Sequence, residues 1–126
     1  MTEVKFSDLQ GKTLKSIKVS DDKERVEIEC DDGKKFVMQH HQDCCESVAV
    51  EDVIGDLADL IGTPILLAEE AVSDKDPEGY NTKDSYRDSF TWTFYKLRTI
   101  KGSVDIRWLG ESNGYYSESV YFEEAA

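Results

Sequence analysis

Residues 25–39 read Arg-Val-Glu-Ile-Glu-Cys-Asp-Asp-Gly-Lys-Lys-Phe-Val-Met-Gln, which is two alternating apolar and polar runs on either side of an Asp-Asp-Gly sequence. Strict alternation is typical of half-buried β-strands, and an Asp-Gly pair is typical of a hairpin turn. A two-residue loop would place apolar side chains beside glutamates. A three-residue loop that ends on Gly33 pairs Ile28 with Phe36 and gathers the apolar side chains on one face. The sequence therefore predicts a hairpin in this second register.

The same register places two consecutive histidines on opposite faces just beyond the hairpin. His40 continues the inward face of Phe36 and Met38, and His41 points outward. The histidines open the segment His-His-Gln-Asp-Cys-Cys-Glu at residues 40–46, which is unusually rich in groups that bind metals. The candidate metal ligands are His40, His41, Asp43, Cys44 and Cys45. Zinc is the metal that such nitrogen and sulfur donors favour.

Three interpretations of this segment remain open. No histidine or cysteine follows Cys45, and Cys30 is predicted to lie at the far end of the hairpin. A zinc site would therefore be local, or completed by a carboxylate or by a second chain. Alternatively, the segment is a structural corner in which Cys44 or Cys45 packs in the core as a small apolar residue. A cysteine nucleophile activated by a neighbouring histidine is the third interpretation, although no catalytic residue is assigned.

The remaining pattern predicts an α+β fold with a mostly antiparallel sheet. A strand over 14–19 precedes the hairpin, and apolar residues at three- and four-residue steps predict one short helix over 51–61. Gly62 and Pro64 suit its C-terminal end. A strand over 65–71 follows. The C-terminal part is predicted to be a three-stranded meander, with strands from 90, over 104–108 and over 115–123.

The length of 126 residues fits a single domain spanning 1–126. Within it, residues 73–89 carry no periodicity and contain a proline, a glycine and an asparagine that break regular structure. Connections of this length are unusual in a compact domain, so this loop is expected to be flexible or functional.

Aromatic and basic residues in the meander form a second candidate site. Adjacent tyrosines beside serine and asparagine make an adaptable contact surface, although the simplest interpretation of this stretch is a tight turn. Arginines near aromatic rings could instead hold a nucleotide. The candidate binding residues are Trp92, Tyr95, Arg98, Arg107, Asn113, Tyr115 and Tyr116.

The charge balance limits the classes of partner. The chain has 27 acidic and 15 basic residues, a formal net charge of −12. Sequence-independent DNA binding is disfavoured, because it comes largely from lysine and arginine replacing phosphate counterions. The acidic surface either keeps the protein soluble or meets a basic partner. No apolar run approaches the roughly 20 residues of a membrane span, and three cysteines do not form a disulfide framework. A cytoplasmic location is expected.

Four ordered motifs resemble a known family. They are His-His-x-Asp-Cys-Cys-Glu-Ser at 40–47, Glu-Asp-Val-Ile-Gly-Asp-Leu at 51–57, Thr-Trp-Thr-Phe-Tyr-Lys at 91–96 and Gly-Glu-Ser-Asn-Gly-Tyr-Tyr-Ser at 110–117. The chain is similar to a family of small acidic proteins of unknown function that phages and prophages carry. The resemblance implies an accessory protein in the bacterial host cytosol that acts by binding rather than by catalysis.

These observations lead to one expected function and one alternative. The protein is expected to inhibit or sequester a host component, either a basic nucleic-acid-binding or defence protein or a small nucleotide signal. No cofactor is expected in that case. The alternative is a metal-binding protein with zinc at residues 40–46. A second copy of the chain stays open as a further partner.

Overall fold

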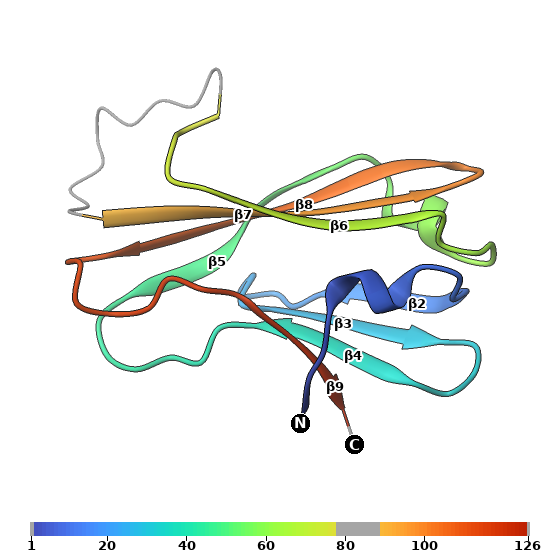
Figure 1. Ribbon diagram of the computed structural model, residues 1–126, viewed down its shortest axis with the longest axis horizontal. Coiled ribbons are helices and arrows are strands. Elements are labelled where there is room, and N and C mark those ends of the chain that lie inside the picture. Colours follow the sequence, from blue (N-terminus) through green and yellow to red (C-terminus); the bar gives the residue numbers. More distant parts are fainter. Residues whose placement is uncertain (1, 78–88, 126) are drawn as a thin grey trace.

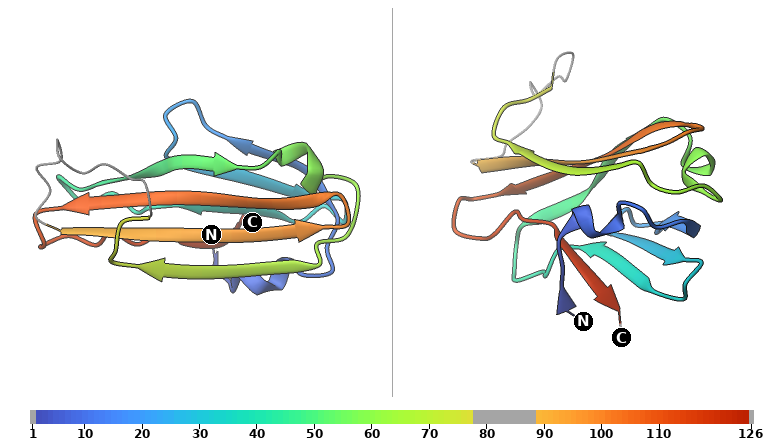
Figure 2. Two further views of the ribbon diagram at one scale, coloured as in Figure 1. Left: turned by 90° about the horizontal axis from the view of Figure 1, so that it is seen from above. Right: turned by 45° about the vertical axis from the view of Figure 1, so that its right-hand side comes forward.

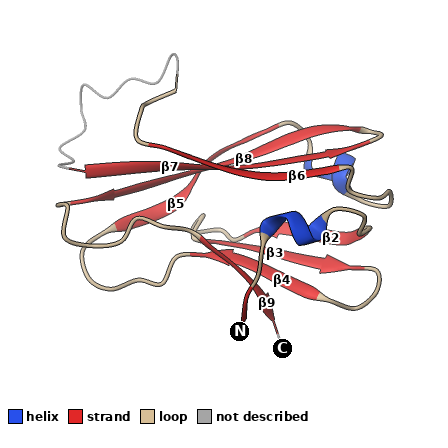
Figure 3. Cartoon of the chain, viewed as in Figure 1, coloured by secondary structure: helices blue, strands red, loops and turns tan. Residues whose placement is uncertain are grey.

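The computed structural model describes residues 2–77 and 89–125, and it shows two antiparallel sheets packed face to face (Figures 1 and 3). The first sheet has the strand order β1-β9-β4-β3-β2. Its strands are β1 (Thr2–Glu3), β2 (Leu14–Val19), β3 (Arg25–Cys30), β4 (Lys35–Gln39) and β9 (Tyr121–Ala125). The two ends of the chain lie together here, because β1 pairs with β9.

The second sheet has the order β5-β8-β7-β6, so that β5 and β6 are its edge strands. Its strands are β5 (Ser47–Ile54), β6 (Leu67–Ser73), β7 (Ser89–Thr99) and β8 (Gly102–Ser112). Two single 3-10 turns, η1 (Phe6–Leu9) and η2 (Leu57–Leu60), complete the described elements. Viewed from above, β6 and β5 lie at opposite edges of this sheet (Figure 2).

The predicted hairpin register is confirmed. Ile28 lies opposite Phe36, Val26 lies opposite Met38, and Gly33 at the turn has a positive φ of 89°. The three-residue loop therefore places the apolar side chains of β3 and β4 on one face. The strand predicted over 14–19 is β2, with the same bounds.

The core lies between the two sheets and is filled by alternate residues of each. Phe36 and Met38 of the first sheet and Tyr95 and Trp108 of the second are almost fully buried there. The ring of Phe6, carried by the N-terminal segment, lies 4.6 Å from the ring of Tyr95 in an edge-on contact. Such contacts between large aromatic side chains contribute most of the burial that holds a small sandwich together.

The predicted helix over 51–61 is wrong, because its apolar positions belong to two different elements. Val53 and Ile54 end β5, while Leu57 and Leu60 lie in η2. Between them Gly55 has a positive φ of 113°, which interrupts any helix. Their helical spacing therefore comes from a strand end and a turn placed one after the other. The chain is in fact a strand to Ile54 followed by the short turn η2.

The predicted third strand of the meander is also wrong. Both edges of β8 are occupied, by β7 on one side and β5 on the other. The chain therefore leaves the second sheet after Ser112 and returns to the first, where Phe122 of β9 pairs with Met38 of β4. Glu118 anchors the crossing segment, because its buried carboxylate accepts hydrogen bonds from Thr91 at 2.7 Å and Ser112 at 2.5 Å.

The fold class must be corrected accordingly. The described residues form an antiparallel β-sandwich with two 3-10 turns, and not the α+β arrangement with a helix. The strand predicted over 65–71 exists but runs from Leu67 to Ser73. The loop predicted over 73–89 connects β6 to β7, and its residues 78–88 lie outside the described residues. Among the described residues, no helix has the length and apolar character to cross a membrane.

Candidate functional site

The chain crosses between the sheets twice at one end of the molecule, and His40 joins the two crossings. Residues 40–46 connect β4 to β5, and residues 113–120 connect β8 to β9 (Figure 1). The buried ring of His40 donates from Nδ1 to the carbonyl oxygen of Ser119 at 2.6 Å, and its Nε2 lies 2.8 Å from Glu46 Oε2. The predicted inward orientation of His40 is confirmed.

Glu46 is the centre of this corner. Its buried side chain accepts hydrogen bonds from the backbone N–H groups of Asp43 and Cys44 and from the side chain of Gln42. The hydrogen bond from His40, supported by the two backbone N–H groups, lowers the pKa of Glu46 from its ordinary 4.5 to about 2. A carboxylate and a carbonyl oxygen can only accept hydrogen bonds, so each ring nitrogen of His40 faces an acceptor.

The other metal-ligand candidates point elsewhere. His41 is exposed, as predicted, and its Nε2 lies 3.1 Å from Glu123 beside the ring of Tyr121. Cys44 and Cys45 are exposed, so the prediction that one of them packs in the core is wrong. The structure joins the two by a disulfide with an S–S distance of 2.14 Å. Cys30 is buried at the far end of β3, as predicted, and burial raises the pKa of its thiol to about 11.

The arrangement of these donors bears on the zinc prediction. Within residues 2–77 and 89–125, no three His, Cys, Asp or Glu side chains converge on a point that could hold a metal ion. His40 is engaged by Glu46 and Ser119, and the two cysteines are bonded to each other. Asp43 is exposed at the surface of the corner. Zinc binding stays a prediction, and this geometry does not favour it.

The predicted aromatic and basic set is divided among three places. Trp92 and Arg107 lie together on the outer face of the second sheet, with the guanidinium 5.3 Å from the centre of the indole ring. Arg107 is also held by Glu51, whose Oε2 accepts from Nε at 2.6 Å. Trp92 is buried and donates from Nε1 to Asp76 at 3.0 Å.

The remaining members of that set do not join this pair. Tyr95 faces the opposite way, into the core, where burial raises the pKa of its phenol. Arg98 is exposed towards the far end of β7, opposite Ser103. In the crossing segment, the side chain of Asn113 accepts from the backbone N–H of Tyr115, whose own side chain is exposed, and Tyr116 follows. The structure therefore does not gather the seven residues into one pocket.

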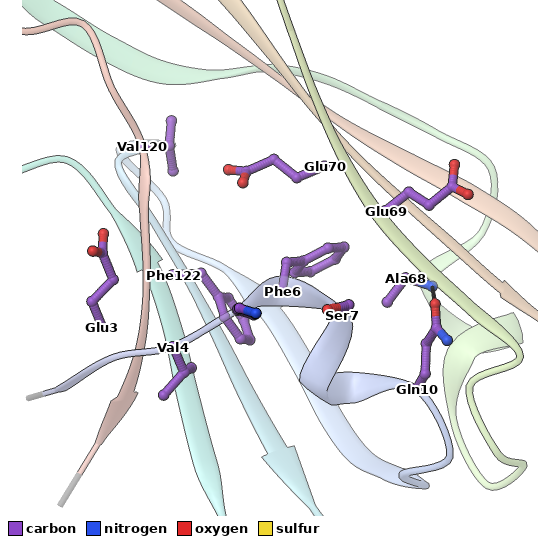
Figure 4. Close-up of a pocket in the computed structure, with 11 residues that line it drawn as sticks. Glu3, Val4, Phe6, Ser7, Gln10, Ala68, Glu69, Glu70, Val120 and Phe122 are labelled. Carbon is purple, nitrogen blue, oxygen red and sulfur yellow. Dashed lines mark hydrogen bonds between the residues drawn. The ribbon is translucent and has the colours of Figure 1, made fainter.

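A cleft that the sequence did not reveal lies between the sheets on the β6 side, with a volume of about 770 Å³ (Figure 4). Its floor is apolar and includes Phe6 and Phe122, while Glu3, Glu69 and Glu70 stand around it. The other residues that line it are Val4, Lys5, Ser7, Gln10, Ala68 and Val120. The cleft combines an apolar base with a carboxylate rim.

A second hollow of about 230 Å³ extends this cleft along β6. It shares Glu3, Glu70 and Val120 with the first, and it continues past Val72. The polar side chains of Thr91, Thr93 and Ser119 also line it. The one sequence signal for this site is β6 itself, where two adjacent glutamates interrupt a predicted strand. The two glutamates do not show that β6 is an edge strand, because that position depends on pairing between strands far apart in the sequence.

Charge gives the cleft its chemical character. In the described part of the chain, ion pairs involve Lys12, Arg25, His40, His41 and Arg107, and none of them reaches a carboxylate of the cleft. Lys5 is the one basic residue that lines it. An acidic rim above an apolar floor favours a ligand that carries both positive charge and apolar surface.

Comparisons with known proteins identify the family. No curated protein matches the chain, and no solved structure matches it. A family model described as a domain of unknown function, DUF7448, matches residues 7–122, which include every strand except β1 and the last residues of β9. The chain belongs to the DUF7448 family.

Proposed function

We propose that this protein is an accessory protein of phage or prophage origin that binds a basic protein of the bacterial host. The bound host protein is a nucleic-acid-binding or defence protein in the cytosol, and binding inhibits or sequesters it. The phage origin rests on the four sequence motifs. The basic target rests on the net charge of −12 and on the acidic cleft.

The observation that carries the proposal is that three glutamates gather at the cleft, where Lys5 is the one basic residue of the lining and no ion pair among the described residues involves them. Glu3 and Glu70 line both hollows, and Glu69 stands beside them on β6. Like charges held close together raise the energy of the free protein, and a basic partner relieves that repulsion. Complementary charge also speeds association and excludes acidic competitors.

A small nucleotide is the less favoured ligand. Trp92 and Tyr95 have no exposed ring face to stack on a base, because both are fully buried. Arg107 already pairs with Glu51 and lies over Trp92, so its charge is partly neutralised. The geometry therefore favours a protein target.

The test begins with capture and ends with a purified pair. The immobilised protein is exposed to host extract, and retained proteins are identified by mass spectrometry. A retained basic protein is then purified and titrated against the free chain at about 50 and 200 mM salt. Affinity is expected to fall steeply over this range, because exposed charges are screened within about 10 Å at 0.1 M.

A matched variant separates the cleft from the rest of the acidic surface. Replacing Glu3, Glu69 and Glu70 by glutamine should weaken the purified complex. Replacing the exposed residues Asp21, Glu24 and Asp31 by their amides changes the net charge equally and should weaken it little. An affinity that does not change with salt, or a retained set with no excess of basic proteins, would refute the proposal.

A further inference from the structure

The outer edge of β6 has hydrogen-bonding groups that no described strand uses. One side of β6 pairs with β7 from Leu67 to Ser73, and the order of the sheet ends there. The N–H of Ala68 points away from β7, since it donates to the side chain of Gln10 at 3.2 Å. Backbone groups alternate in direction along a strand, so the N–H groups of Glu70 and Val72 point outward as well.

The side chains of β6 place this free edge directly above the cleft. Ala68, Glu70 and Val72 lie opposite Leu97, Tyr95 and Thr93 and share their inward face, yet only Ala68 is buried. Val72 is 65 % exposed and lines the second hollow. Figure 4 shows Glu70 above the ring of Phe6, with Glu3 across the cleft.

Charge determines which kind of strand could be added at this edge. A second copy of the chain pairing through its own β6 would bring its Glu69 and Glu70 against these two glutamates, and like charges across a strand pair are destabilising. A segment rich in lysine or arginine would instead place positive charges against these glutamates. One basic side chain would point inward between Glu70 and Glu3, and the next would point outward near Glu69.

We infer that β6 binds an extended basic segment of the partner protein as an additional strand. Main-chain hydrogen bonds from Glu70 and Val72 supply affinity, and the cleft selects inward side chains by charge and apolar contact. From Ala68 to Val72 the edge is about 15 Å long, which is enough for five extended residues. This inference rests on the proposed function, because it takes the partner to be a basic protein.

The experiment uses two short synthetic peptides of equal charge. One alternates lysine and valine, and the other replaces alternate valines by proline, which cannot pair as a strand. Calorimetry measures the affinity of each for the full chain. Amide hydrogen exchange then reads out the N–H groups of Glu70 and Val72 directly. The first peptide is expected to bind and to slow exchange at both positions, and the proline peptide is expected to do neither.

Two pairs of variants separate strand addition from general attraction. Val72→Pro removes an N–H group that points outward and makes no bond to β7. It should weaken binding of the first peptide about five- to tenfold, whereas Val72→Ala should weaken binding less. Glu70→Gln should weaken the peptide several-fold, and Glu24→Gln, with the same charge change on an exposed turn, should not. Circular dichroism confirms that each variant is folded.

Each possible result either supports or contradicts strand addition at β6. Equal losses in Glu70→Gln and Glu24→Gln, or unchanged binding in Val72→Pro, would overturn strand addition. Slowed exchange that depends on protein concentration without peptide would show that the edge pairs with a second copy instead. If a purified basic host protein binds but leaves exchange at Glu70 and Val72 unchanged, this inference fails while the proposed function stands. If no basic host protein binds at all, the proposed function fails.

Discussion

His40 lies between two acceptors, a backbone carbonyl and a carboxylate, and this arrangement explains the residues around it. Glu46 accepts from His40 and from two backbone N–H groups, which together favour its ionised form over the cost of burial. The sequence predicted the inward direction of His40 from the hairpin register. It could not predict the pairing, because Ser119 is brought to His40 only by the crossing of β9 into the first sheet.

The change in stability at low pH should reveal the ionisation of Glu46. Its pKa falls on folding from about 4.5 to about 2, so its contribution is complete above pH 4.5 and is lost as the pH falls towards 2. In Glu46→Gln the free energy of unfolding should therefore decrease less steeply over this range than in the original protein. Urea unfolding at several pH values measures the two slopes. The exposed neighbour Asp43 supplies the control. The assignment would be contradicted if the slope were unchanged in Glu46→Gln and changed in Asp43→Asn.

At the scale of elements, strand β5 shows where a local pattern fails. Val48, Val50, Val53 and Ile54 are all β-branched, which favours a strand, but the end of β5 and the turn η2 together gave the apolar positions a helical spacing. The hairpin β3–β4 was predictable because its partner lies next to it in sequence. The position of β9 was not, because a turn after Ser112 shows where the chain bends and not which sheet it joins.

Gly55, which ends β5, should tolerate no side chain. It has a φ of 113°, and an added Cβ would lie 2.5 Å from the carbonyl oxygen of Ser103. Gly33 also has a positive φ, but a Cβ there would meet nothing within 4 Å. Gly55→Ala is therefore expected to lose about 1–3 kcal/mol more than Gly33→Ala, since overpacking is added to backbone strain. Urea unfolding of both variants measures the difference, and equal losses would show that β5 can shift to relieve the contact.

For the whole molecule, the two flanks of the sandwich differ in a way that creates the cleft. On the flank of β5 a backbone hydrogen bond ties the sheets together, from the N–H of Val50 to the carbonyl oxygen of Lys23 at 2.7 Å. On the flank of β6 the N-terminal segment lies between the sheets, and the acidic cleft opens beside it (Figure 4). Under the proposed function, this acidic flank is where a basic partner would bind.

Under the proposed function, the charges that would attract a basic partner also destabilise the free chain, so salt should change affinity and stability in opposite directions. With a net charge of −12, screening reduces self-repulsion, and the melting temperature should rise by about 2–5 °C between about 20 and 200 mM NaCl. Affinity for a basic partner should fall over the same range. The triple variant at Glu3, Glu69 and Glu70 should show a smaller rise, because some of the repulsion has been removed. Calorimetric melting at each salt concentration measures this. A melting temperature that falls with added NaCl would mean that attractive pairs outweigh repulsion, and loss of binding in salt could then reflect unfolding rather than screening of the cleft.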